Sequence, residues 1–203
     1  AGLLIASKAF DHATSCSSEN SLVLLDDVRD AMLQALREQG ALLLDSAEKA
    51  RLQAIMWRHG KLSDAVTGKS ARHIAELAGV DWRGRIAQEA PAVLMVEEGG
   101  IGEAHPFSGE KLSPVLAVYR AADFGQACST VRSIYGYMGA GHSVSLHSAH
   151  EEQAFHLAQH LPVARVIVNQ AHCFATGGNF DNGLPFSLSM GCGTWGGNNF
   201  SDN

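Results

Sequence analysis

Short apolar runs alternate with amphipathic segments along most of this chain, and this alternation limits the possible folds more than any other feature. Runs short enough for one strand each occupy residues 21–25, 41–44, 91–100, 113–121, 141–148 and 164–170. Strands that alternate with helices form βαβ units around a mostly parallel sheet covered by helices on both faces. The sequence therefore predicts an α/β fold with three layers (αβα) and a single domain over residues 1–203.

The segments between these strands carry helix signals. One helix follows Asp26, which can cap it, keeps its apolar positions on one face and ends at Gly40. A second begins with Ser46 as its N-cap and ends at Gly60, and a third covers residues 70–78. Two further helices are expected over residues 122–136 and 149–161.

Charge and composition exclude several classes of protein. The net charge is −6 and Lys and Arg form no cluster, which argues against nucleic-acid binding. No apolar run approaches the roughly 20 residues of a membrane span, and the apolar start at residues 1–10 lacks the basic region of a signal peptide. The four cysteines form no CxxC pair, so reduced thiols in a cytoplasmic protein are expected.

Several motifs carry a resemblance to a known family. "FDHATSCSSENS" (10–21) is similar to the FDNG..CASEQ segment of the CoA-acylating aldehyde dehydrogenases. Four later segments are similar to further motifs of that family, in the same order: 68–80, "HPFSGEKLSPVLAVYRA" (105–121), "GAGHSVSLHS" (139–148) and "SMGCGTWGGNNFSDN" (189–203). The resemblance covers the whole chain, and it is the order of several motifs that makes it specific.

The resemblance implies the catalytic domain of an NAD(P)-dependent enzyme that turns a short aldehyde into its acyl-CoA. The nearest members act on sulfoacetaldehyde or succinate semialdehyde. In the family a Rossmann-like domain precedes this part and binds most of the NAD or NADP. The chain contains neither a GxGxxG turn nor a Walker loop, so we expect that domain upstream, an inactive isolated segment and a homo-oligomeric full-length enzyme.

Cys16 is the first candidate site residue. Its neighbourhood alone permits a buried filler, half of a disulfide, a metal ligand or a nucleophile, and spacing favours the filler. The resemblance instead implies the nucleophile that adds to the aldehyde and carries the acyl group as a thioester. Small neighbours such as Ala13, Ser15 and Ser17 leave room for a substrate.

Three further residues take roles from the resemblance. His142 of "GAGHS" corresponds to a family histidine and is expected to handle a proton in the CoA step. Glu110 of "GEKLSP" corresponds to a glutamate that binds the nicotinamide ribose hydroxyls. Leu112, near it, stands where hydrolytic relatives have phenylalanine, which agrees with the acylating branch.

Several residues in or near the expected strand 164–170 and the loop that follows it are weaker candidates. His172 and Arg165 are candidates to meet an anionic substrate group, and Asn169, Asn179 and Cys192 are candidates to line its site. His12 replaces the asparagine of FDNG and is expected to face the site, and Cys128 is read as core. No HExxH pattern and no His-x3-His pair among His12, His147 and His172 supports a metal site.

Two alternatives to the acylating enzyme stay open at this level. A hydrolytic aldehyde dehydrogenase would give the free acid from the same thioester. A non-catalytic fragment would contribute only to oligomerisation.

Overall fold

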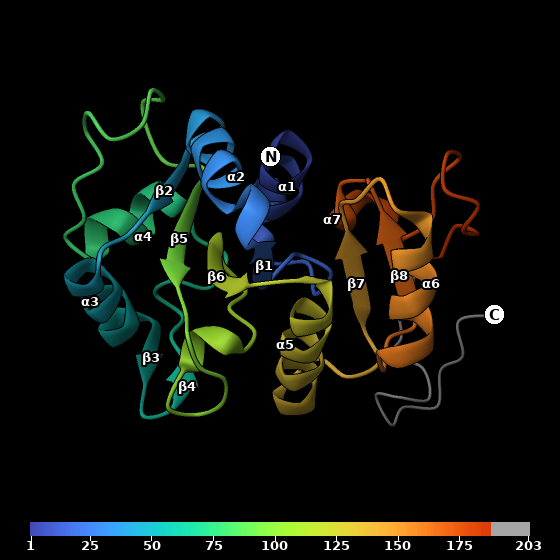
Figure 1. The fold of residues 1–203 in the computed structure, drawn as a ribbon. Helices are drawn as coiled ribbons and strands as arrows, with labels where there is room; N and C mark the ends of the chain where they lie inside the picture. The colour runs from blue at the N-terminus through green and yellow to red at the C-terminus, as the bar shows by residue number, and fades with distance from the viewer. Residues whose placement is uncertain (188–203) are drawn as a thin grey trace.

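The computed structural model describes residues 1–187, and its centre is a parallel sheet of four strands (Figure 1). The strands lie in the order β1 (Ser21–Leu25), β6 (Val115–Ala121), β5 (Val93–Glu97) and β2 (Ala41–Leu43). The register pairs Ser21 with Ala117 and Leu94 with Val115, all in parallel. The expected parallel sheet is confirmed.

Helices cover both faces of this sheet, as a three-layer αβα fold requires. On one face, α1 (Gly2–Ala9) and α2 (Asp26–Glu38) enclose a core that includes Val93 and Met95. On the other, α3 (Ser46–Met56) and α4 (Ala71–Leu77) enclose a core that includes Leu94 and Val96. Neighbouring residues of β5 are therefore buried on opposite faces, which is why its sequence is a continuous apolar run.

A second parallel sheet lies beside the first (Figure 1). It contains β7 (Ser143–Leu146) and β8 (Arg165–Val168), joined by α6 (Glu151–His160). One face packs against α5 (Phe124–Tyr137) through a core of Cys128, Val144, Leu157 and Leu161. Cys128 is a core residue, as expected. The six main strands, however, divide into two sheets, with α5 between them (Figure 1).

The second helix ends earlier than the sequence indicates. α3 stops at Met56, and residues 57–62 form a hairpin of β3 (Trp57–Arg58) and β4 (Lys61–Leu62). The two turn residues, His59 and Gly60, have φ of 52° and 75°, as tight hairpin turns require. Trp57 is held by an edge-on contact with Phe107 at 4.9 Å, a tertiary contact with no signal in the local sequence.

Both expected helix caps are wrong. Asp45, not Ser46, is the N-cap of α3, because its carboxylate accepts from Glu48 N at 2.8 Å while Glu48 Oε2 accepts from Asp45 N. Asp26 lies in the first turn of α2 without a side-chain cap and pairs with Arg120 instead. Ser70 caps α4, its side chain accepting a hydrogen bond from His73 N, a cap that was not predicted.

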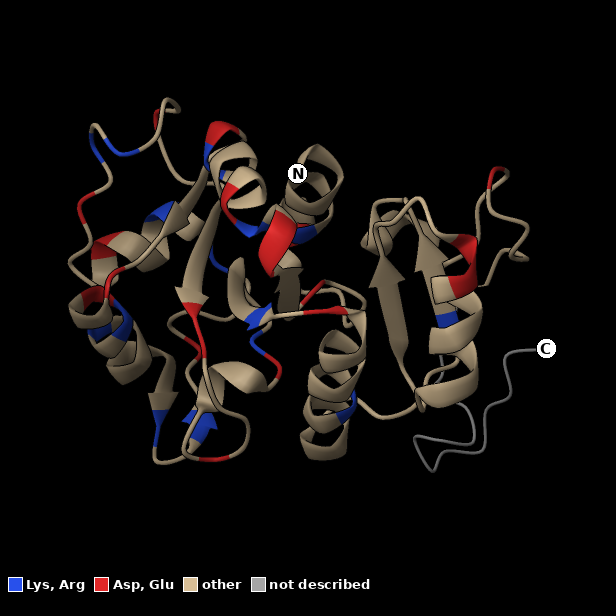
Figure 2. Ribbon diagram, viewed as in Figure 1, with Lys and Arg blue, Asp and Glu red and all other residues tan. Residues whose placement is uncertain are grey.

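Short helices complete the description. Four short elements were not predicted: α1, α7 (His172–Ala175) and the 3-10 turns η1 (Phe10–Ala13) and η2 (Pro106–Ser108). Acidic and basic residues are interspersed over the larger part of the molecule (Figure 2). Over residues 1–187, no helix has the length and apolarity needed to cross a membrane.

The reciprocal cap predicts that Asp45→Ala lowers the free energy of unfolding by about 1 kcal/mol, because the amide of Glu48 loses its acceptor. Denaturant unfolding of the protein measures this. Ser46→Ala is the matched control and should change stability by less than about 0.5 kcal/mol. Equal losses in both variants would contradict the assignment of the cap.

Candidate active site

Cys16 lies at an exposed tip of a tight turn. Ser18 N donates to Ser15 O at 3.0 Å to close the turn, and the hydroxyls of Ser15 and Ser17 bond at 2.8 Å. Ser17 N also donates to Ser15 Oγ at 3.3 Å. Because Cys16 is exposed, its interpretation as a buried filler is wrong. Cys128, in contrast, is buried, and burial raises the pKa of its thiol.

The turn follows a run of left-handed backbone. Asp11, His12 and Ala13 have φ of 47°, 51° and 58°, a region that costs residues with a side chain roughly 1–2 kcal/mol each. The family's FDNG motif has asparagine and glycine at the last two positions, residue types that tolerate this region better. Thr14 Oγ1 offsets part of the strain by donating to both Asp11 O and Asp11 Oδ2.

Asn20 ties the cysteine turn to the segment that carries Glu110. Its side-chain oxygen accepts from Lys111 N at 3.0 Å, and its backbone oxygen accepts from Ala117 N at 3.1 Å. Both segments precede strands that are neighbours in the sheet, β1 and β6. Cys16 and Glu110 therefore belong to the amino-terminal edge of the sheet.

Glu19 ties the turn to α1 and α7. Ser7 Oγ donates to Glu19 Oε2 at 2.8 Å and accepts from Cys173 N at 2.8 Å. Burial raises the pKa of Glu19, although its own backbone, Ser7, Lys8 and the backbone of His172 favour the charged form. An edge-on contact between Phe10 and Phe174, at 4.9 Å, joins the same segments.

Two lysines are buried beneath these loops. Lys111 is fully buried, and its Nζ donates to Phe107 O at 2.6 Å and to Gly109 O at 2.8 Å. Burial holds the pKa of Lys111 well below its ordinary value, and the nearby Lys8 lowers it further. Burial also lowers the pKa of Lys8 to about 7, against the charges of Glu19, Cys173 and Glu110.

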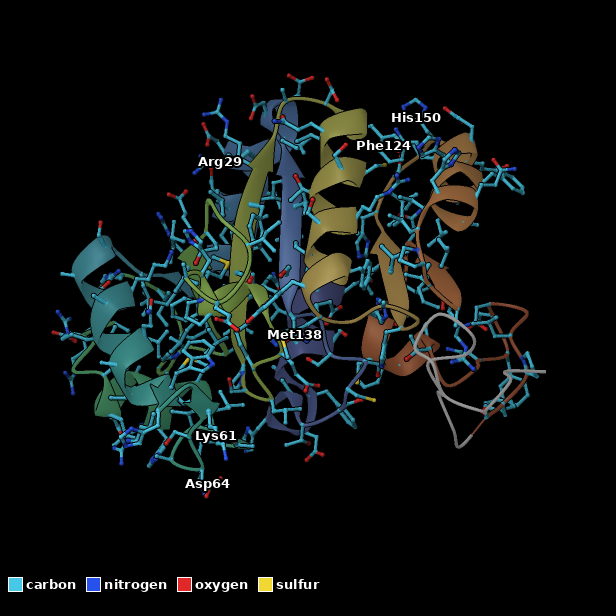
Figure 3. The ribbon with its side chains drawn as sticks, turned by 90° about the horizontal axis from the view of Figure 1, so that it is seen from below. Arg29, Lys61, Asp64, Phe124, Met138 and His150 are labelled. Carbon is cyan, nitrogen blue, oxygen red and sulfur yellow. The ribbon has the colours of Figure 1, made fainter. Side chains whose placement is uncertain are left out.

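The structure exposes Glu110 on a fixed loop. Lys111 Nζ donates to the carbonyl of Gly109, directly before Glu110. Met138 packs against Gly109, since a Cβ added there would come within 2.7 Å of Met138 Sδ (Figure 3). Leu112 has φ of 39°, and its carbonyl accepts from Gly68 N at 2.9 Å. An exposed carboxylate on such a loop suits two hydroxyl donors.

His142 comes directly before β7 and is linked to α7. Its Nδ1 lies 3.1 Å from Ser143 Oγ, which lies 2.6 Å from His172 Nε2. His172 is buried, and burial lowers its pKa to about 3, with further lowering from His142 and His147. Burial therefore disfavours the positive charge that His172 would need to meet an anionic substrate group.

The other substrate candidates are placed as follows. Asn169, in left-handed backbone with φ of 54°, uses its amide to accept from Ser148 N and to donate to Ser148 O, which is a structural role. Asn179 accepts from Asp181 N at 3.4 Å. Arg165 is half-buried at the start of β8. Cys192 and the motif at 189–203 lie outside the described residues.

One surface hollow of about 280 Å³ lies beside α7, apart from Cys16. Its lining includes Leu3, Asn169, Gln170, Phe174 and Asn179. His12 is exposed, next to the cysteine turn. Within residues 1–187, no group of three or more His, Cys, Asp or Glu side chains is arranged to hold a metal ion.

The chain is similar to proteins of one enzyme class. It is 66% identical over 97% of its length to the sulfoacetaldehyde dehydrogenase (acylating) of Cupriavidus necator. It is 32% identical over 98% of its length to the succinate-semialdehyde dehydrogenase (acetylating) of Clostridium kluyveri. The chain spans 39% of the first relative and 43% of the second. No family model matches the sequence.

Solved structures agree with these relatives. An acetylating aldehyde dehydrogenase from Geobacillus thermoglucosidasius superposes with a TM-score of 0.90 at 33% identity, over 99% of this chain and 43% of that one. A propionaldehyde dehydrogenase from Rhodopseudomonas palustris, solved with bound propionyl-CoA, shares the fold at 19% identity, with a TM-score of 0.74 over 87% of this chain and 38% of that one.

Sequence reasoning missed the residues that support these loops. Ser7 and Lys8 lie outside the motifs, whereas Glu19 and Lys111 lie within the motifs at 10–21 and 105–121 but were given no role there. An indirect signal was available: Lys8 is the single charged residue of the apolar stretch 1–10. Such a residue is buried only where the tertiary structure supplies partners.

The burial of Lys8 predicts a pH dependence of stability. The pKa of its ammonium group is about 7 in the folded protein and 10.5 for a freely exposed lysine, so between these values the unfolded state binds more protons and stability rises with pH. The free energy of unfolding of the wild type, minus that of Lys8→Met, should rise by at most about 1.4 kcal/mol per pH unit above pH 7. Denaturant unfolding from pH 7 to 9.5 measures the difference.

Lys61→Met is the matched control, because Lys61 is exposed (Figure 3). Its stability difference from the wild type should stay flat over the same range. A flat difference for Lys8→Met as well would show that Lys8 is not buried in the protein.

Proposed function

The chain is a homologue of the acylating aldehyde dehydrogenases over the part of their length that it spans, and we propose that it carries their thioester chemistry on Cys16. The proposed reaction of the full-length protein is aldehyde + NAD(P)⁺ + CoA → acyl-CoA + NAD(P)H + H⁺. The exposed thiol at the tip of a bonded turn, anchored at both ends, is the observation that carries this proposal.

Cys16 is the proposed nucleophile. Its thiolate forms a C–S bond to the aldehyde carbon, and the carbonyl becomes an oxyanion. The bound nicotinamide supplies the hydride acceptor, so that loss of hydride from that carbon leaves a thioester on Cys16. The CoA thiolate then attacks the thioester, and the Cys16 thiolate leaves.

Glu110 and His142 have the two supporting roles in this proposal. The exposed carboxylate of Glu110 would accept hydrogen bonds from the ribose hydroxyls of NAD(P), on a loop that Lys111 and Asn20 hold next to the cysteine turn. His142 would accept the proton of the CoA thiol. Leu112 would contact the cofactor beside Glu110.

The thioester proposal predicts that Cys16→Ala of the full-length protein loses turnover by at least about a thousandfold, since alanine cannot form the thioester that Cys16 is proposed to carry. NAD(P)H absorbance and mass spectrometry of the product, with and without CoA, measure it. Cys173→Ala is the control and should keep most activity. Acyl-CoA formation by Cys16→Ala would overturn the proposal, and a free acid as the sole product would favour the hydrolytic alternative.

The substrate we propose is sulfoacetaldehyde, from the 66% identity to an enzyme of that name. A sulfonate needs a cationic partner, and with His172 neutral the candidate is Arg165 at the start of β8. We expect Arg165→Gln to lower kcat/KM for sulfoacetaldehyde by about tenfold or more, as loss of a charge-assisted hydrogen bond would. The value for uncharged propionaldehyde should change little, and an equal loss for both aldehydes would exclude a charge-specific role.

A further inference from the structure

A serine joins two histidines between the start of β7 and α7. Ser143 Oγ is 3.1 Å from Nδ1 of His142 and 2.6 Å from Nε2 of His172. The backbone around the serine is also held, because Tyr135 Oη donates to Ser143 O. The hydroxyl has one proton, so it can donate to only one of the two rings.

His172 is suited to accept that proton. The residue is only 4% exposed, and burial favours the neutral ring, which keeps a lone pair for one acceptor nitrogen. Its Nδ1 is buried and has no hydrogen-bond partner in the part of the chain that the structure describes. The ring therefore makes its side-chain bond to Ser143 through Nε2.

The two distances agree with one direction of the bonds. Hydroxyl donors make shorter hydrogen bonds than N–H donors, so the 2.6 Å contact fits Ser143 donating to His172 and the 3.1 Å contact fits His142 donating to Ser143. The lone pairs of the serine then face the N–H at Nδ1 of His142. With the proton on Nδ1, a neutral His142 keeps its lone pair on Nε2.

We propose that Ser143 and His172 are positioning residues that hold His142 with its proton on Nδ1, so that Nε2 takes the proton of the CoA thiol. This inference rests on the proposed function, because it assigns a support to the proposed base. The S–H bond breaks, its proton joins Nε2, and the sulfur keeps the electron pair that forms the new bond to the thioester carbon. The imidazolium keeps its Nδ1–H bond to Ser143, so neither ring has to turn during the step.

Other charged groups face this arrangement. Arg165 pairs with Ser143 in the register of β7 and β8, so both side chains lie on one face of that sheet. His147 follows β7, and Glu19 and Lys8 lie near the start of α7. These groups are unchanged in variants of Ser143, so their effect on His142 cancels when those variants are compared with the wild type.

The test compares Ser143→Ala with Ser145→Ala in the full-length protein. Ser145 is two residues along the same strand and on the same face, and its buried hydroxyl has no partner among the described residues. Rapid-mixing kinetics separates the burst of NAD(P)H from acyl transfer to CoA. We expect Ser143→Ala to slow acyl transfer by about tenfold or more, with an unchanged burst and an unchanged KM for the aldehyde, and Ser145→Ala to change neither step.

A second readout does not depend on turnover. Carbethoxylation of His142 by diethyl pyrocarbonate, followed by mass spectrometry of the peptide over pH 5–9, reports when Nε2 is unprotonated. Loss of the acceptor for Nδ1–H disfavours the imidazolium, so Ser143→Ala should move the midpoint down by about one pH unit. If the wild type makes no acyl-CoA, the proposed function fails, while this midpoint still tests the positioning of His142.

Conservative variants complete the design. Ser143→Thr keeps the hydroxyl and should keep the wild-type midpoint and acyl-transfer rate. His172→Gln supplies an amide oxygen to Ser143 and should fall between the wild type and His172→Ala. An unchanged midpoint in Ser143→Ala, an equal shift in Ser145→Ala or a failure of Ser143→Thr to keep the wild-type midpoint would each overturn the proposal.

Discussion

The parallel pairing of β1 with β6 brings the two loops of the candidate site together. Parallel neighbours start at the same edge of a sheet, so the segment before β1, with Cys16, and the segment before β6, with Glu110, meet there. The bond from Lys111 N to Asn20 Oδ1 fixes that meeting at 3.0 Å. Segments about ninety residues apart in the sequence thus become two sides of one candidate site.

This edge is built at a cost in stability. Three consecutive residues before Cys16 occupy left-handed backbone, and two lysines are buried beneath the loops. Strained backbone and buried lysines of this kind persist only where the surrounding structure holds them. Here the capped helix α3 and the hydrophobic cores on both faces of the four-stranded sheet supply that support. Such an arrangement suits a site that has to keep a thiol exposed in one orientation.

The second sheet joins this edge through α7. Ser7 links Glu19 to Cys173 at the start of α7, and His172 of the same helix reaches Ser143 and, through it, His142. Cys16, the proposed nucleophile, and His142, the proposed base, are therefore connected through α7, a short helix outside the family motifs. Positioning of this kind places reacting groups with little freedom to lose in the transition state.

By itself the sequence determined the βαβ alternation, the parallel strands buried on two faces, the core role of Cys128 and the family resemblance of the segments around Cys16, Glu110 and His142. These features are local, since strand runs, helix periods and motifs are each written in consecutive residues. Only the tertiary structure decided that the strands divide into two sheets, that Lys8 and Lys111 are buried and that His172 is buried and bonded to Ser143. Burial and hydrogen bonding of these side chains depend on residues far away in the sequence, and burial is what sets their charge.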